Sequence, residues 1–272
     1  MAGEADRKPT AQPGANVTGV DAYSPAEVAG RVEAAGVVKA ALPADKLIVL
    51  AILAGAFIGF GAALYTVAVS DPGLGFGPTR LLGGLAFSLG LVLVVVAGAE
   101  LFTGNALIVM AWADRRVTTG ELARNWLLSF VGNALGAVGL AMAVWLSGIL
   151  DAGPAHDTAV RIAETKMGFP FVEAFVRGIL CNVLVCLAVW LCFAARSVTD
   201  KILAIVFPIT AFVALGFEHS IANLYLLPVG LLAGADGSLV GVVGNLVPVT
   251  LGNIVGGAGG VAAVYWAIYL RK

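Results

Sequence analysis

Six apolar stretches, each about long enough to cross a bilayer, restrict the fold of this chain more than any other feature. A helix needs about 20 apolar residues to cross about 30 Å of hydrocarbon. The stretches are Leu47–Val69, Leu81–Trp112, Asn125–Leu150, Gly178–Ala195 with some preceding residues, Ile202–Leu232, and a last one that begins near Val240–Pro248 and ends at Leu270. They predict an all-α polytopic membrane protein with six transmembrane helices.

The composition agrees with a bilayer as the surroundings of this chain. Apolar residues without Gly make up 60% of it and charged residues 12%, whereas soluble domains have about 25% charged residues. Too few polar residues remain to cover a water-facing surface. The net charge of −1 argues against nucleic-acid binding, which needs a basic face.

The N-terminal segment lacks the apolar centre of a cleavable signal peptide. We expect residues 1–23 to form a disordered cytoplasmic tail and residues 43–272 the transmembrane channel domain. Between them, Ser24, Pro25 and Glu27 form the pattern of a helix start with a capping box. Apolar residues then recur at helical spacing, which predicts an amphipathic helix over 24–42. This helix lies along the membrane surface, packs on the protein's own cytoplasmic loops, or does both.

The distribution of Lys and Arg predicts the orientation. With a cytoplasmic N-terminus, twelve of these residues lie in inside segments and four outside, namely Arg80, Arg161, Lys166 and Arg177. This bias follows the positive-inside rule and places both termini in the cytoplasm.

Spans two and five have an unusual length of about 31 residues, too long for one straight crossing and too short for two. Their polar residues lie in the middle, at 101–105 and 216–220. Irregular backbone at membrane depth is tolerated only inside the protein or beside a watery cavity. We predict breaks near Thr103 and near Glu218–Ser220, facing each other beside a pathway.

The two halves of the chain share a repeated pattern. Four residues of span three recur 120 positions later, and three residues of span two recur 118 positions later in span five. The pairs are Asn125 and Asn245, Gly132 and Gly252, Asn133 and Asn253, Gly136 and Gly256, Gly98 and Gly216, Glu100 and Glu218, and Asn105 and Asn223. Three spans per half predict two inverted repeats, at about 47–150 and 171–270. Half-helix N-termini at the midplane would favour an anion.

Ionisable residues at membrane depth are costly and point to function. His219 lies on the second break, and we interpret it as a permeation residue. The alternative is that it only hydrogen-bonds two helices together. We expect Glu100 and Glu218 to be structural acceptors for N–H groups of the broken segments.

Other function classes lack their motifs in this sequence. An aquaporin would carry two Asn-Pro-Ala boxes, and the chain has none. An enzyme would need a nucleophile with a base, or a metal-binding cluster. Cys181, Cys186 and Cys192 have no His or acid at ligand spacing. We expect neither an enzyme nor a bound metal or other cofactor.

Four strings carry a resemblance to the formate/nitrite transporter family, from about residue 25 to the C-terminus. They span residues 99–104, 178–190, 216–223 and 249–257, and the run Gly216-Phe217-Glu218-His219-Ser220 is the most distinctive. The resemblance implies an aquaporin-like protomer, a homopentamer with one pore per protomer, and the cytoplasmic membrane of a prokaryote. The residues from Ile221 to Pro228 look closest to formate channels, so formate is the expected substrate, with nitrite and hydrosulfide as alternatives.

The resemblance also implies roles for individual residues. It makes His219 the central pore histidine, faced by Thr103, with Asn182 and Glu218 supporting the histidine by hydrogen bonds. It implies an apolar constriction of Phe87, Leu91, Phe102 and Phe212, and vestibule lysines at Lys39 and Lys166, which would concentrate small anions. A bare anion crosses such a constriction at a large desolvation cost. Either a protonated His219 pairs with the anion, or it supplies a proton, and proton-coupled symport stays an alternative to a channel.

Overall fold

The structure, a computed structural model, describes residues 21–71, 73–151 and 153–271. The tail predicted over 1–23 lies almost entirely outside these residues. The regular elements in the described part of the chain are all helical. They are α1 (Pro25–Ala40), α2 (Ala44–Ala68), α3 (Phe76–Val92), η1 (Leu93–Gly98), η2 (Gly104–Ile108), α4 (Val109–Ala113), α5 (Thr119–Leu146), η3 (Ile149–Asp151), α6 (Ala155–Met167), α7 (Phe171–Ala194), α8 (Val198–Leu215), α9 (Ser220–Leu232), α10 (Leu239–Ile254), η4 (Val255–Ala263) and α11 (Val264–Tyr269).

Within the described residues, six helices are long and apolar enough to cross a membrane. They are α2, α3 continued by the π-helical η1, α5, α7, α8, and the continuous helix formed by α10, η4 and α11. Polar caps fix where several of them begin. The hydroxyls of Thr118 and Ser197 accept from the backbone N–H groups of Glu121 and Asp200, which satisfies N–H groups that a helix start leaves free.

Spans two and five are broken, as predicted. The helix formed by α3 and η1 ends at Gly98, and η2 with α4 completes span two from Gly104 to Ala113. In span five, α8 ends at Leu215 and α9 runs from Ser220. Most residues of α9 are buried, because this helix is apolar on all sides and packs inside the protein.

Glycines allow the closest helix contacts of each half. A Cβ placed on Gly136 of α5 would collide with the carbonyl oxygen of Ile52 in α2. A Cβ placed on Gly256 in η4 would collide with the carbonyl oxygen of Ile179 in α7. Small residues let helix backbones approach closely in lipid, so these two pairs of helices are packed backbone to backbone.

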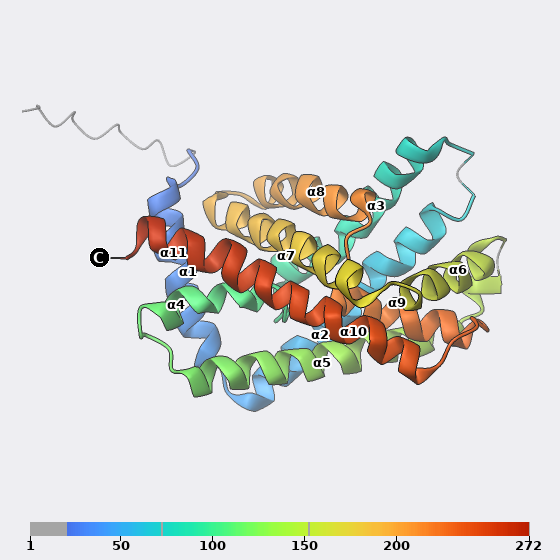
Figure 1. The fold of residues 1–272 in the computed structure, drawn as a ribbon. Helices are drawn as coiled ribbons and strands as arrows, with labels where there is room; N and C mark the ends of the chain where they lie inside the picture. The colour runs from blue at the N-terminus through green and yellow to red at the C-terminus, as the bar shows by residue number, and fades with distance from the viewer. Residues whose placement is uncertain (1–20, 72, 152, 272) are drawn as a thin grey trace, which may run out of the picture.

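The short helices α1 and α6 lie at opposite ends of the bundle (Figure 1). The start of α1 has the predicted capping box of Ser24 and Glu27. Its buried face packs on η2, α4, α7 and α11, so α1 rests on the protein itself, which is one of the two arrangements expected for it. The helix α6 packs on α9 and α10. Such placement of α1 and α6 fits an inverted duplication.

Candidate functional site

The break in span five begins at a glycine that ends α8. Gly216 has φ +75°, a conformation that glycine adopts without a Cβ clash. The N–H groups of Gly216 and Phe217 bond back to the carbonyls of Val213 and Phe212, both at 3.0 Å, which closes the end of α8. The break in span two begins in the same way at Gly98, with φ +87°.

Asn253 of α10 holds the second break in place. Its Nδ2 donates to the carbonyl oxygens of Gly178, at 2.8 Å, and Glu218, at 3.0 Å. Its Oδ1 accepts from the N–H of Ser220 at 2.9 Å. One buried amide therefore pairs the two backbone groups that the break leaves free, on Glu218 and Ser220, and links them to Gly178 of α7.

Asn133 of α5 holds the first break with the same three bonds. Its Nδ2 donates to the carbonyl oxygens of Ala51, at 2.7 Å, and Glu100, at 2.9 Å. Its Oδ1 accepts from the N–H of Phe102 at 2.9 Å. The expectation that the side chains of Glu100 and Glu218 accept from backbone N–H groups of the breaks is wrong, because the asparagines do so.

The Glu218 carboxylate binds side chains instead. Lys166, in the last turn of α6, lies 2.7 Å from Oε1 of Glu218. Asn223 donates to Oε2 of Glu218 and to Oδ1 of Asn245, both at 2.7 Å. Asn245 in turn donates to the carbonyl oxygen of Lys166 at 2.8 Å. A buried carboxylate is stable when it is paired and hydrogen-bonded, and Glu218 is both.

An equivalent network surrounds Glu100. Lys39, in the last turn of α1, lies 2.7 Å from Oε1 of Glu100. Asn105 donates to Oε2 of Glu100 and to Oδ1 of Asn125, both at 2.9 Å. Asn125 donates to the carbonyl oxygen of Lys39 at 3.0 Å. Each of these bonds has its counterpart in the other half, which supports the duplication inferred from the sequence.

His219 caps α9 with its own ring. Its Nδ1 accepts from the backbone N–H of Ala222 at 3.1 Å, so this nitrogen carries no proton in this geometry. The other nitrogen, Nε2, lies 2.9 Å from Oγ1 of Thr103. The histidine and the threonine, both buried, thus join the two breaks, as the resemblance implied for this pair.

Two cavities flank the breaks and share no lining residue. The first cavity has a volume of about 480 Å³, and its wall includes Leu91, Leu101, Glu100, Asn105, Arg31, Lys39 and Lys201. The second cavity has a volume of about 370 Å³, and its wall includes Phe87, Phe212, His219, Tyr65, Glu218, Lys166, Arg80, Arg161 and Arg177. Charged residues therefore lie on the walls of both cavities.

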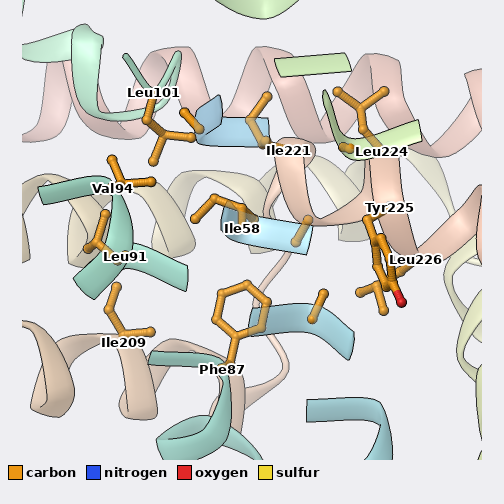
Figure 2. Close-up of a cluster of buried hydrophobic side chains, with 14 of the residues drawn as sticks. Ile58, Phe87, Leu91, Val94, Leu101, Ile209, Ile221, Leu224, Tyr225 and Leu226 are labelled. Atoms are coloured by element: carbon orange, nitrogen blue, oxygen red, sulfur yellow. The ribbon is translucent and has the colours of Figure 1, made fainter. Parts of the chain in front are cut away.

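An apolar barrier separates the two cavities. Leu91 lies on the wall of the first cavity and Phe87 on that of the second, one turn or about 6 Å apart on α3. The ring of Phe87 packs edge-on against Phe212 with 5.5 Å between centroids, and Phe212 stacks on His219 at 6.0 Å. Figure 2 shows Leu101 and Leu91 in the same buried cluster as Phe87.

Three residues of the predicted site, Phe102, Asn182 and Glu218, have other contacts than expected. Phe102 packs edge-on against Phe130 and Trp126 and lies on neither cavity wall, whereas its neighbour Leu101 lies on the first. Asn182 does not bond to the ring of His219.

Asn182 bonds to backbone groups near His219 and not to the histidine itself. Its Nδ2 donates to the carbonyl oxygens of Thr103, at 3.2 Å, and Asn253, at 2.6 Å. Glu218 likewise bonds to Lys166 and Asn223 and not to the imidazole. Asn182 therefore bonds to the backbone of Thr103, whose hydroxyl contacts His219.

Sequence reasoning gave no functional role to Asn133 and Asn253, although both were markers of the repeat. The signal in the sequence was that each asparagine recurs at the same spacing from two glycines in both halves. Leu101 and Tyr65 had no sequence signal that separated them from other apolar residues of their spans.

Known proteins resemble this chain over most of its length. The model of the formate/nitrite transporter family matches residues 26–267. The formate channel FocA of Escherichia coli is 42% identical over 274 residues, covering 93% of this chain and 96% of the relative. A probable formate transporter of Methanothermobacter thermautotrophicus is 43% identical, covering 92% of this chain and 98% of the relative. Among solved structures, a pentameric formate channel with formate bound has a TM-score of 0.77 and 42% identity, covering 84% of this chain and 98% of that one.

Proposed function

Because this chain belongs to the formate/nitrite transporter family, we propose that it carries formate through a pore in each protomer of a homopentamer. Its likeness to formate channels over nearly its whole length carries this proposal. The six membrane-crossing helices and the paired breaks support it. By the positive-inside rule the first cavity faces the cytoplasm, as do both termini, and the second faces outward.

The permeation path runs from one cavity to the other past Leu91, Phe87, Phe212 and His219. We add Leu101 to this constriction because it lies on the first cavity wall, and we keep Phe102 as the residue whose packing on Phe130 positions the first break. The path is apolar, so a bare anion loses its hydration there at a large cost.

His219 and Thr103 reduce this cost at mid-pore. Nε2 of His219 is the ring nitrogen that is not occupied by the cap of α9, so it is the one available to the anion or its proton. Formate, the anion of a weak acid, crosses as the neutral acid after taking a proton, or paired with a protonated imidazole, in which case Nδ1 gains a proton and releases the N–H of Ala222. The alternative to this channel is symport of formate with a proton.

The lysines of the two networks have two roles, one in each network and one in attracting anions to the vestibules. Lys39 and Lys166 compensate the carboxylates of Glu100 and Glu218, and they draw small anions towards each mouth of the pore. The side chain of Lys39 is 31% exposed and that of Lys166 14%, so both still reach the cavities.

Flux into liposomes tests the substrate. Formate, nitrite and hydrosulfide are supplied in parallel to liposomes that contain the purified protein. The mass of the protein in detergent is measured separately to establish the pentamer. We expect formate to cross fastest. Faster flux of nitrite or hydrosulfide would assign the other substrate, and no flux of the three would contradict the proposal. Formate accumulation driven by an imposed pH gradient, against a formate gradient, would show that a proton crosses with each formate, by symport or as the neutral acid.

A further inference from the structure

Two arginines approach the same point of the second break. A Cβ placed on Gly216 would lie 3.0 Å from Nη2 of Arg80 and 3.2 Å from Nη1 of Arg177. Arg80 comes from α3 and Arg177 from α7, and both line the second cavity. The equivalent position in the first half, Gly98, has no atom within 4 Å of such a Cβ. This pair of guanidinium groups therefore belongs to one mouth of the pore alone.

Neighbouring residues fix Arg177 in its position. Its Nη1 donates to the carbonyl oxygen of Gly216 at 2.7 Å, and its Nη2 pairs with Glu173 at 2.6 Å. Its backbone carbonyl accepts from the N–H of Glu218 at 3.3 Å. Arg177 thus connects the surface of α7 to the break that carries His219.

Arg80 has no comparable partner. Among the described residues it forms no ion pair with an acid, and its Nε is buried without a hydrogen-bond partner. Its guanidinium carbon lies 5.3 Å from the ring centroid of Phe76. A half-buried guanidinium held beside a second one is unfavourable unless an anion lies between or beside them.

The charges on the wall of the second cavity agree with an anion as the missing partner. Four cations line it, Arg80, Arg161, Lys166 and Arg177, and the carboxylate of Glu218 is the one acid among its lining residues. Lys166 already occupies that carboxylate. Arg161 has a separate contact, from its Nη2 to Oγ1 of Thr158 at 3.1 Å.

We propose that Arg80 and Arg177 form a carboxylate-binding clamp at Gly216, which holds a small carboxylate anion in the second cavity before it reaches His219. Guanidinium groups suit this ligand because their N–H groups match the two oxygens of a carboxylate. The absence of a side chain at Gly216 leaves the space between them open. The clamp rests on the proposed function for its ligand, the permeant formate.

Protection from chemical modification tests binding without transport. The full-length protein in detergent is treated with phenylglyoxal, which modifies arginine, and each arginine is followed by mass spectrometry. Sodium formate should protect Arg80 and Arg177 at lower concentration than sodium chloride of equal ionic strength, and should protect Arg161 less. Equal protection by both salts, or none, would overturn the clamp.

Flux kinetics of matched variants separate a clamp from diffuse charge. Arg80→Gln and Arg161→Gln remove the same charge from the same cavity, but only the first removes a guanidinium beside Gly216. We expect Arg80→Gln to raise the formate concentration for half-maximal flux about tenfold when formate enters from the second cavity, with an unchanged maximal rate. Arg161→Gln should raise it much less, and Arg80→Lys should restore it only in part.

The opposite results would overturn the clamp. Equal effects of Arg80→Gln and Arg161→Gln, or full restoration by Arg80→Lys, would show that charge alone acts here. Arg80→Gln is the main variant because Arg80 forms no ion pair in the described structure, and an intact pentamer by mass confirms its folding. Protection without any formate flux would refute the proposed function and keep the clamp, whereas flux without protection would do the reverse.

Discussion

Nε2 of His219 lies 2.9 Å from Oγ1 of Thr103, and at this contact the break of span five meets the break of span two. Each break is held by an asparagine of the following span, and each contains a carboxylate paired with a lysine. The histidine and threonine, like the two arginines at Gly216, have no counterpart in the other half. The symmetric networks fix the frame, and this asymmetric pair lies between the two breaks.

Thr103→Val removes the hydroxyl from the contact while nearly keeping the side-chain volume. It leaves Nε2 of His219 without its partner, and a buried group without its hydrogen bond costs about 1–3 kcal/mol. We expect formate flux to change about tenfold and its pH dependence to shift. Thr103→Ser keeps the hydroxyl and should behave as wild type in the same liposome assay. Equal behaviour of the two variants would exclude a role for this hydrogen bond.

Asn253→Ala should destabilise the protein. It leaves the carbonyl of Glu218 and the N–H of Ser220 unpaired and removes their link to Gly178 of α7, at about 1–3 kcal/mol for each of the two groups that stays dry. Thermal unfolding in detergent measures the loss. Asn133→Ala breaks three equivalent bonds and should cost a similar amount, and Ser147→Ala, at an exposed helix end, should cost little. A small effect of both asparagine variants would contradict their assigned role.

Gly136→Ala and Gly139→Ala compare two glycines of the same helix. The methyl group of the first collides with the backbone of Ile52, and that of the second meets nothing within 4 Å. Because backbone atoms cannot move aside cheaply, we expect a loss of about 1–3 kcal/mol for Gly136→Ala and none for Gly139→Ala. The melting temperatures of the two variants decide this, and equal values would mean that α2 and α5 are packed less closely.

Glu33 in α1 makes stability depend on pH. Burial and the neighbouring carboxylate of Asp114 raise the pKa of Glu33 above its ordinary value of 4.5, against the lowering effect of Arg116. The folded state therefore binds this proton more tightly than the unfolded state, so stability falls as pH rises from about 4.5 through the folded pKa. Glu33→Gln removes this titration. Across that window its melting temperature should rise relative to wild type, and a constant difference would contradict the prediction.

Most of the fold follows from the sequence because lipid leaves few alternatives. The length of span five and the polar residues at its centre predicted its break at Glu218–Ser220, and the structure has it there. His219 was found because a titratable group at membrane depth is rare and costly.

Side-chain directions inside the breaks were harder to predict. Phe102 points at α5 and Leu101 at the first cavity because the irregular backbone there has no fixed period. An asparagine and a carboxylate can both accept from an N–H group, so the pattern did not show that Asn253, and not Glu218, does so. The approach of Arg80 to Arg177 depends on how α3 packs near α7, which one sequence does not reveal.

The central claim is that His219 controls how formate crosses the barrier, and His219→Phe tests it most directly. The variant keeps an aromatic ring and removes the exchangeable proton. Formate flux per pentamer is measured in liposomes over a series of pH values, and the mass in detergent is measured in parallel. We predict an intact pentamer whose flux has lost most of its pH dependence. A pentamer that falls apart while each remaining pore keeps the wild-type pH profile would show that His219 is structural and contradict the account.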